Sequence, residues 1–272
     1  MHSTASDGVL PPGLVVQRAW EAGLDIIALT DHDTLDGLTE ALEAGQRLGV
    51  RVICGCEFSV RVAWGEMHLL GYFLPPAHPA IERFLIDARQ MRFDRARQMV
   101  ESLQAWGVAI SVDDVLAEAG DASIGRPHVA RALVRLGKVP DVATAFDEFL
   151  GLGRRAYVEK VLPDLALVAD LVHGAGGLVS AAHLRDRANR TTLSRLMLDG
   201  LDAVEVRHPR HPPEFTAMLD GLAGSLGLLR TGGTDWHGDE RDPACHLGAW
   251  AVPVEWVMAM EARVASRESR VW

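Results

Sequence analysis

Histidine and carboxylate residues gather in three short clusters that lie far apart in the chain. His2 and Asp7 fall in the opening stretch, His32 follows an apolar strand-like run, and Asp235 and His237 lie near the end. Imidazole nitrogens and carboxylate oxygens are the ligands that Zn²⁺, Mn²⁺ and Fe ions take in proteins. A single residue of this kind is more often an ordinary core or surface residue, but clusters beside several strands predict a shared metal site.

More residues of the same type follow the other strand-like segments. They are Glu57, His68, His183, Glu205 and His208. In α/β folds the carboxyl ends of the strands and the loops after them carry the chemistry. The whole set therefore predicts a multinuclear metal site at one end of a barrel.

The elements that must position these residues alternate along most of the chain. Strands are expected at 24–30, 50–58, 59–63, 67–73, 177–182, 203–206 and 228–231, and helices at 11–23, 35–48, 164–174, 191–198 and 213–226. This alternation predicts largely parallel strands joined by helices, apart from a hairpin-like pair formed by 59–63 and 67–73. From 76 to 160 the pattern is helical, with one short strand pattern at 156–158. We therefore expect an α/β barrel domain formed by 1–75 and 161–272, and a helical insert at 76–160.

Composition limits the classes of function. The formal charge of −10 argues against a general nucleic-acid binder with a basic surface, although bound metals could still attract a small phosphorylated substrate. Cys54 and Cys56 alternate along an expected strand and fit small core residues better than a soft-metal pair. The three cysteines favour a reducing compartment, and no apolar run is long enough to span a bilayer. We therefore expect a cytoplasmic protein without an obligate protein partner.

Several segments together resemble the polymerase-and-histidinol-phosphatase (PHP) superfamily, along almost the whole chain. They are HSTASDG at 2–8, ALTDHDT at 28–34, GCE at 55–57, MHLLGY at 67–72, GRPH at 125–128, AFDEFLG at 145–151, AAH at 181–183 and GTDWHG at 233–238. The two motifs in the helical insert point to the nucleotide-directed branch. That branch contains phosphatases of nucleoside 3′,5′-bisphosphates and related 5′-to-3′ exoribonucleases.

The resemblance implies a distorted (β/α)7 barrel with two or three divalent metal ions, whether Mn, Fe or Zn. The implied ligands are His2, Glu57 and Asp235 for the first ion, Glu57, His68 and His183 for the second, and Asp7, His32 and His237 for the third. Asp31 and Asp33 would orient His32 or the neighbouring loops. His173 falls outside the implied sets and is expected to be a surface or loop residue.

Substrate contacts are implied in two places. Arg126 and His128 would hold a substrate phosphate, and Pro127 independently fits the first position of a helix, whose free N–H groups favour an anion. His208 lies in the loop after an expected strand, where it would contact substrate. His208 and Asp235 are the expected catalytic residues.

The implied activity is metal-dependent hydrolysis of phosphate esters of nucleotides, either 3′,5′-bisphosphates or 5′-phosphorylated oligoribonucleotides, by a metal-activated hydroxide. Two alternatives stay open. One is a phosphatase of another small metabolite such as histidinol phosphate, which the Gly-Arg-Pro-His motif argues against. The other is an inactive, truncated metal-binding PHP protein.

The chain departs from the family pattern at its start. The family opens with Asp-Leu-His-x-His on its first strand, whereas Met1 stands here at the x position. The first His and almost all of that strand are missing, so the start is either misassigned, which we favour, or belongs to a short form with a weakened first metal position. A smaller departure is Leu184, where the family usually has Pro; it should alter a turn without affecting His183.

Overall fold

The structure is a computed structural model that describes residues 1–120, 123–238 and 246–268. The chain forms two units, one made of Met1–Glu82 with Leu162–Trp272 and the other of Arg83–Val161. Among the described residues, no helix combines the length and apolarity that crossing a bilayer requires.

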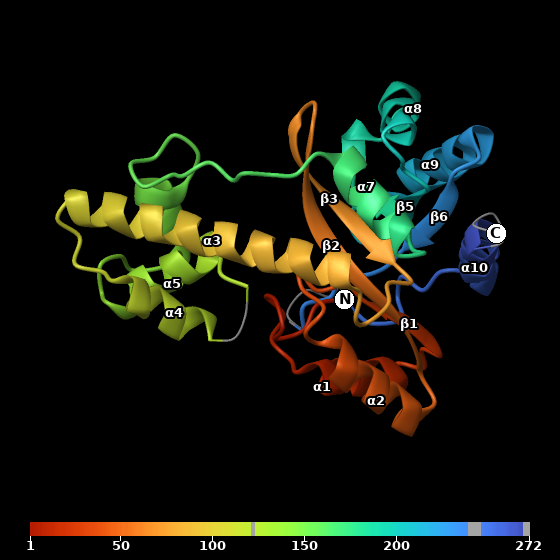
Figure 1. The fold of residues 1–272 in the computed structure, drawn as a ribbon, viewed down its shortest axis with the longest axis horizontal. Helices are drawn as coiled ribbons and strands as arrows, with labels where there is room; N and C mark the ends of the chain where they lie inside the picture. The colour runs from red at the N-terminus through yellow and green to blue at the C-terminus, as the bar shows by residue number, and fades with distance from the viewer. Residues whose placement is uncertain (121–122, 239–245, 269–272) are drawn as a thin grey trace. The chain divides into compact units, whose positions relative to one another are not determined.

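The first unit is built on one curled six-stranded sheet (Figure 1). Its strands, in spatial as well as chain order, are β1 (Ile26–Leu29), β2 (Arg51–Val62), β3 (Gly65–Tyr72), β4 (Leu178–Ala181), β5 (Ala203–Arg207) and β6 (Leu229–Gly232). β2 and β3 form an antiparallel hairpin, and β3 also pairs antiparallel with β4. The remaining pairs are parallel, so the sheet is mixed. The expected hairpin is confirmed, but the segments expected as separate strands at 50–58 and 59–63 form the single strand β2.

Helices follow most strands of this unit. They are α1 (Pro12–Glu21), α2 (Leu38–Leu48), α7 (Leu165–Gly174), α8 (Arg190–Leu198), α9 (Pro213–Leu226) and α10 (Val254–Glu268), with a short 3₁₀ turn, η2, at Arg185–Arg187. Pro12 starts α1 where its missing N–H costs nothing, and Gly49 ends α2 in the left-handed conformation at φ 73°. In Figure 1, α1 lies against β1 and α2 packs on α1 and β2, while α9 lies along β5 and β6. The sequence pattern did not predict α10.

A small apolar cluster lies inside the curl of the sheet. Its buried members are Ile53, Leu70, Tyr72, Leu178, Ala182 and Met260. Met260 comes from α10, so this helix closes part of the sheet's concave face. The cluster lies below the strand ends that carry the predicted site residues.

The second unit is helical and has a core of its own. Its elements are α3 (Pro79–Ala105), which starts in the first unit, α4 (Val112–Ala119), α5 (Arg126–Arg135), α6 (Val142–Ala145) and the π-helix η1 (Phe146–Leu150). Met99, Leu103, Val129 and Leu133 belong to its buried cluster. The strand expected at 156–158 does not form. Ala156 lies in a turn, where its N–H donates to Phe149 O at 2.9 Å, although Ala156 and Val158 still pack on the core.

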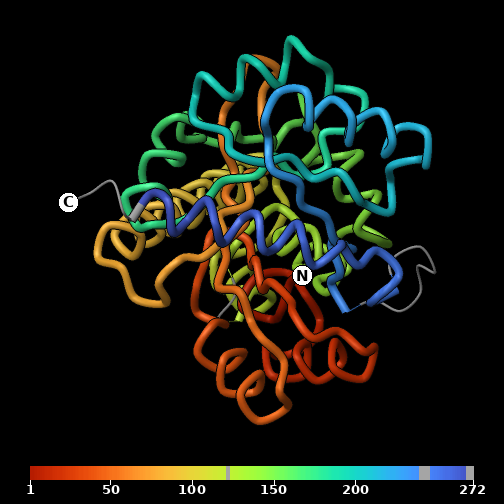
Figure 2. The backbone as a smooth tube through the Cα atoms, turned by 90° about the vertical axis from the view of Figure 1, so that its right-hand side faces the viewer, coloured from red at the N-terminus to blue at the C-terminus, as the bar shows by residue number. Residues whose placement is uncertain are grey.

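The first two residues run beside the open edge of β1. The peptide group between Met1 and His2 bonds on both sides: Thr30 N–H donates to Met1 O at 3.0 Å, and His2 N–H donates to Trp236 O at 2.8 Å. Among the described residues, β1 otherwise pairs with β2 alone and β6 with β5 alone. Figure 2 shows the N-terminus near the middle of this unit, and the two bonds place it between β1 and the chain after β6.

Candidate metal centre

A short loop at the N-terminus is shaped by one buried carboxylate, Asp31. Asp31 accepts hydrogen bonds from Ser3 N–H at 2.6 Å, Ser3 Oγ at 2.7 Å and Ser6 Oγ at 2.7 Å. These bonds turn the backbone so that His2 and Asp7, on either side of them, both reach the end of the sheet. Asp31 thus orients the loop that carries His2 and Asp7, whereas sequence analysis assigned it to His32 or neighbouring loops without naming this one.

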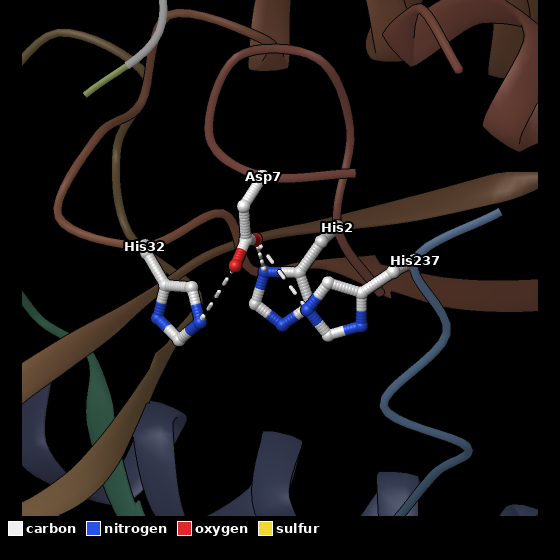
Figure 3. A group of neighbouring side chains, drawn as sticks. All are labelled: His2, Asp7, His32 and His237. Carbon is white, nitrogen blue, oxygen red and sulfur yellow. Dashed lines mark ion pairs between the residues drawn. The ribbon is translucent and has the colours of Figure 1, made fainter. Parts of the chain in front are cut away.

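Four side chains from three clusters converge on one point. They are His2, Asp7, His32 and His237, and each offers a ligand atom within 4.8 Å of the others. In Figure 3 the carboxylate of Asp7 lies among the three imidazoles. Its oxygens are 3.4 Å from His237 Nε2 and 3.9 Å from His32 Nε2.

Glu57 is the centre of a second convergence. It is only 2% exposed and sits on β2, close to where that strand passes the end of β1. Its carboxylate lies 2.7 Å from His68 Nδ1, 3.0 Å from His2 Nε2 and 3.3 Å from His183 Nε2. His68 comes from β3 and His183 follows β4, so the curl of the sheet brings together side chains more than a hundred residues apart.

Asp235 completes a third group with His2 and Glu57. Its carboxylate is 3.2 Å from His2 Nε2. Asp235 and His183 both adopt positive φ angles, 51° and 29°, which non-glycine residues rarely do. Such strain concentrates at functional sites, because the surrounding structure holds the residue there for its side chain.

The charges of the group are unbalanced. Burial disfavours ionisation of Glu57, but hydrogen bonds from His183, His2 and His68 outweigh it and hold its pKa well below the usual range. Burial also disfavours the imidazolium of His2, yet Asp235 and Glu57 raise the pKa of His2 to about 9. At His32 burial prevails and lowers the pKa to about 4. The carboxylates thus stay ionised and draw a proton onto His2, as expected of a site that demands positive charge.

The donor set fits divalent cations. Among the described residues, the buried Nδ1 of His2 has no hydrogen-bond partner, although it lies among ligand-type atoms. An orphaned buried nitrogen costs about 1–3 kcal/mol unless something fills its place. Three carboxylates with several imidazoles can supply cations with the mixed O/N ligands that Mn, Fe and Zn accept.

Sequence analysis grouped Glu205 with the expected metal-site residues but gave it no ligand position. Glu205 lies on β5, and its buried carboxylate accepts the backbone N–H of His183 at 2.7 Å. Burial raises the pKa of Glu205 to about 8. The hydrogen bond fixes the strained backbone of His183, next to Leu184. A carboxylate in an otherwise apolar strand was the only signal of this role in the sequence.

His208 lies at the edge of the group and is 1% exposed. Its Nδ1 accepts the N–H of Arg210 at 3.1 Å, so Nε2 carries the proton. That Nε2 lies 4.0 Å from a carboxylate oxygen of Asp235, and among the described residues it has no hydrogen-bond partner. His208 therefore presents an unused donor beside the predicted metal ligands.

Arg126 and His128 lie at the start of α5 in the second unit. The Arg126 guanidinium lies 5.7 Å from the ring centres of both Phe146 and Tyr157, and it donates weakly to Leu150 O at 3.5 Å. His128 Nδ1 accepts Gly125 N–H at 3.0 Å and caps the helix. Two aromatic rings thus orient Arg126, and one of them, Phe146, is presented by the π-helix.

Comparison with known proteins identifies the family of the chain. Residues 1–119 match the family model of the PHP domain. A 5′-3′ exoribonuclease of Haemophilus influenzae is 33% identical over 241 residues, which cover 87% of this chain and 88% of that protein. The chain belongs to the PHP family. A 3′,5′-nucleoside bisphosphate phosphatase of Chromobacterium violaceum is 36% identical over 244 residues, 87% of this chain and 85% of that protein.

A solved structure has a similar fold over nearly the full length of the chain. It is described as a metal-dependent phosphoesterase from Bifidobacterium adolescentis, with a TM-score of 0.82, 34% identity, and coverage of 96% of this chain and 94% of that one. The distorted barrel predicted from sequence is therefore confirmed, here as a six-stranded half-barrel. The chain is a metal-dependent phosphoesterase, so the prediction of an enzyme is confirmed as well.

Proposed function

We propose that this PHP protein hydrolyses phosphate esters of nucleotides, either 3′,5′-bisphosphates or 5′-phosphorylated oligoribonucleotides. The observation that carries the proposal is the convergence of His2, Asp7, His32 and His237 beside the group centred on Glu57. Divalent ions held there would polarise phosphoryl oxygens and make water a stronger nucleophile. The two relatives compared above act, by their names, on substrates of these two classes.

We assign the ligand positions as the sequence predicted them. Glu57 would serve two ions, the first with His2 and Asp235 and the second with His68 and His183. Asp7, His32 and His237 would hold a third. Two or three ions of Mn, Fe or Zn are expected, because neither donor type selects among these metals. A cytoplasmic location stays a prediction.

The chain's own residues have separate tasks in the reaction. Glu57 and Asp235 keep their negative charge and would hold the cations, while Glu205 fixes the backbone of His183. The Nε2–H of His208 points to no described acceptor and would donate to a substrate oxygen. Donation to the leaving-group oxygen would make His208 a general acid.

Arg126 and His128 would bind a second phosphate of the substrate, which explains a preference for bisphosphates over monoesters. The fork of a guanidinium suits two phosphoryl oxygens, and the flanking rings restrict its rotation, so less entropy is lost on binding. We propose that the helical insert then acts as a lid over the substrate.

A substrate panel tests the function and separates it from histidinol phosphate hydrolysis. With Mn²⁺ added, release of phosphate should be fastest from nucleoside 3′,5′-bisphosphates or 5′-phosphorylated oligonucleotides. Arg126→Ala should raise KM for bisphosphates by roughly 10–100-fold, since a charge-assisted bond contributes about 1.5–3 kcal/mol. KM for a simple aryl phosphate should hardly change.

Arg131→Ala is the matched control, because Arg131 is exposed on the same helix. It should leave both KM values unchanged. Equal effects of Arg126→Ala on bisphosphate and aryl phosphate would show that Arg126 does not bind the second phosphate. Faster hydrolysis of histidinol phosphate than of any nucleotide would overturn the proposed substrate class.

A further inference from the structure

Three exposed arginines lie in the strand-end loops on the same side of the sheet as the predicted metal site. Arg185 and Arg187 belong to the η2 turn, which begins two residues after His183, and Arg210 lies in the loop after β5. Among the described residues, their guanidinium groups form no ion pair and no hydrogen bond with another residue. Even Asp186, which lies between the first two, forms no ion pair with them.

Elsewhere in the first unit, six arginines lie within ion-pair distance of a carboxylate. They are Arg18, Arg51, Arg61, Arg195, Arg230 and Arg267. The whole chain carries a formal charge of −10, so carboxylates are plentiful. Cations left uncompensated beside the predicted metal site therefore favour an anion with more charge than the metals alone would take up.

The tip of the β2–β3 hairpin carries an aromatic ring beside one of these arginines. β3 pairs with β4 only from Leu69 to Tyr72, so the hairpin continues past the end of β4 (Figure 1). Trp64 lies in the turn that joins the two strands of the hairpin and is partly exposed. The Arg187 guanidinium lies 5.9 Å from the centre of the Trp64 ring, within the range of a cation–π contact.

This tip is a short distance from the predicted metal ligands. Four residues along the hairpin separate Trp64 from His68, which at roughly 3.4 Å each amounts to about 14 Å. Arg185 is two residues from His183, whose Nε2 lies 3.3 Å from the Glu57 carboxylate. Arg185, Arg187 and Trp64 thus form a strip that begins beside the metal site and ends at the hairpin tip.

A single-stranded nucleic acid needs this combination of groups. Cationic side chains bind its backbone phosphates, and aromatic rings stack on its bases. A mononucleotide bound at the metals would not extend about 14 Å to the ring of Trp64. The strip therefore matches a substrate that continues beyond its first nucleotide.

We propose that the strip binds the nucleotides that follow the 5′-terminal one, so that 5′-phosphorylated oligoribonucleotides bind better than nucleoside 3′,5′-bisphosphates. This inference rests on the proposed function, which places the 5′-terminal nucleotide at the metals. Arg185 and Arg187 bind backbone phosphates, and Trp64 stacks on a base. Because every base has a π face, the strip does not select among base sequences.

Trp64→Ala tests the stacking with two substrates, a 5′-phosphorylated ribopentanucleotide and a nucleoside 3′,5′-bisphosphate. KM for the pentanucleotide should rise about tenfold, as the loss of one stacked base predicts, while KM for the bisphosphate changes less than about twofold. Trp64→Tyr keeps an aromatic ring and should restore most of the pentanucleotide KM. Trp20→Ala, which removes a 52% exposed tryptophan from α1, is the matched control and should leave both KM values unchanged.

Arg187→Gln tests the phosphate contacts without catalysis. The readout is the Kd of a fluorescein-labelled pentanucleotide whose first linkage is a non-hydrolysable phosphonate, measured by anisotropy with the metal-loaded protein. The variant should raise Kd and reduce the slope of log Kd against log salt concentration by about 0.7, the contribution of one phosphate contact to a single strand. Arg195→Gln makes the same charge change on α8 and should leave Kd and slope unchanged.

The proposal is overturned if Trp64→Ala raises both KM values equally, or if Arg187→Gln behaves like Arg195→Gln. Failure of the proposed function has a different signature. The protein would then hydrolyse neither nucleotide substrate, yet Trp64→Ala and Arg187→Gln would still weaken binding of the labelled pentanucleotide.

Discussion

Two buried carboxylates at opposite ends of the parallel strands have opposite surroundings. Glu57, at the end where the site lies, faces three imidazoles and no Lys or Arg within ion-pair distance in the described structure. Asp202 precedes β5 at the other end and is 5% exposed. It accepts Val179 N–H at 3.0 Å and bonds to His173 at 2.7 Å and to Arg267.

The difference shows that the charge of Asp202 stabilises the fold, whereas the charge of Glu57 is available for binding. Asp202 is compensated by a permanent cation and ties α7, β4 and α10 together. The negative charge of Glu57 is balanced only when a neighbouring histidine, above all His2, is protonated. His2 Nδ1 has no hydrogen-bond partner in the described structure. A carboxylate paired with a permanent cation serves the fold, whereas Glu57, paired only with imidazoles, can exchange their protons for a metal cation.

The largest effect is expected from Glu57→Gln. The amide keeps the shape but loses the charge that would hold two cations, so activity should fall by roughly 10²–10³-fold or more. Bound metal, measured by elemental analysis, should fall with it, while far-UV circular dichroism stays unchanged. Full activity and full metal content in this variant would remove Glu57 from the site and end the comparison.

Asp31→Asn should weaken metal binding without contacting the metal. The neutral amide accepts the bonds from Ser3 and Ser6 less well, so the loop that places His2 and Asp7 loosens. We expect a loss of roughly 10–100-fold in metal affinity, measured by titration of the metal-free protein. Asp36→Asn, at an exposed position nearby, is the control and should bind metal as the parent does.

Asp202→Asn should have the complementary effect, on stability rather than on chemistry. The variant removes the negative charge and one of the two acceptor oxygens that Arg267 and His173 share, and because both partners are partly exposed the cost should be about 1–3 kcal/mol. Tm should fall by several degrees, while kcat of the folded fraction is unchanged. A drop in kcat with unchanged Tm would mean that the two ends of the sheet are coupled.

The smallest effect is the pH dependence of the same pair. Burial alone would raise the pKa of Asp202, but bonds from His173, Val179 N–H and Arg267 outweigh burial and lower it. A depressed carboxyl pKa stabilises the fold above the unfolded value of about 3.9, and this stability is lost as pH falls through the folded value. The difference in Tm between parent and Asp202→Asn should therefore shrink below about pH 4. A constant difference down to pH 2 would contradict this assignment.

His173 shows where sequence analysis was wrong in detail. It was expected to be a surface or loop residue, but it lies in the last turn of α7 and bonds to the buried Asp202, 29 residues further along the chain. Nothing in the local pattern indicated this partner, because a helix-terminal histidine is common at surfaces. The helix α10, which supplies Arg267, was not predicted either.

The sequence by itself determined the residue types of the site and the order of most elements. Apolar runs followed by His or Asp at 32, 183 and 235 predicted strand ends, because the local pattern of side chains reflects burial over a few residues. The family motifs then supplied the barrel and its chemistry. These signals span only a few residues each, so they can be recognised without knowing the structure of the rest of the chain.

Only the tertiary structure decided which of these residues meet and what else supports them. The antiparallel pairing of β3 on both sides brings His68 and His183 to Glu57, and no local pattern encodes a pairing between strands separated by the insert. The bond from His183 N–H to Glu205 and the open edges beside β1 and β6 are likewise long-range features. They depend on how the whole sheet curls, because hydrogen bonds and packing between distant segments form only once the fold is complete.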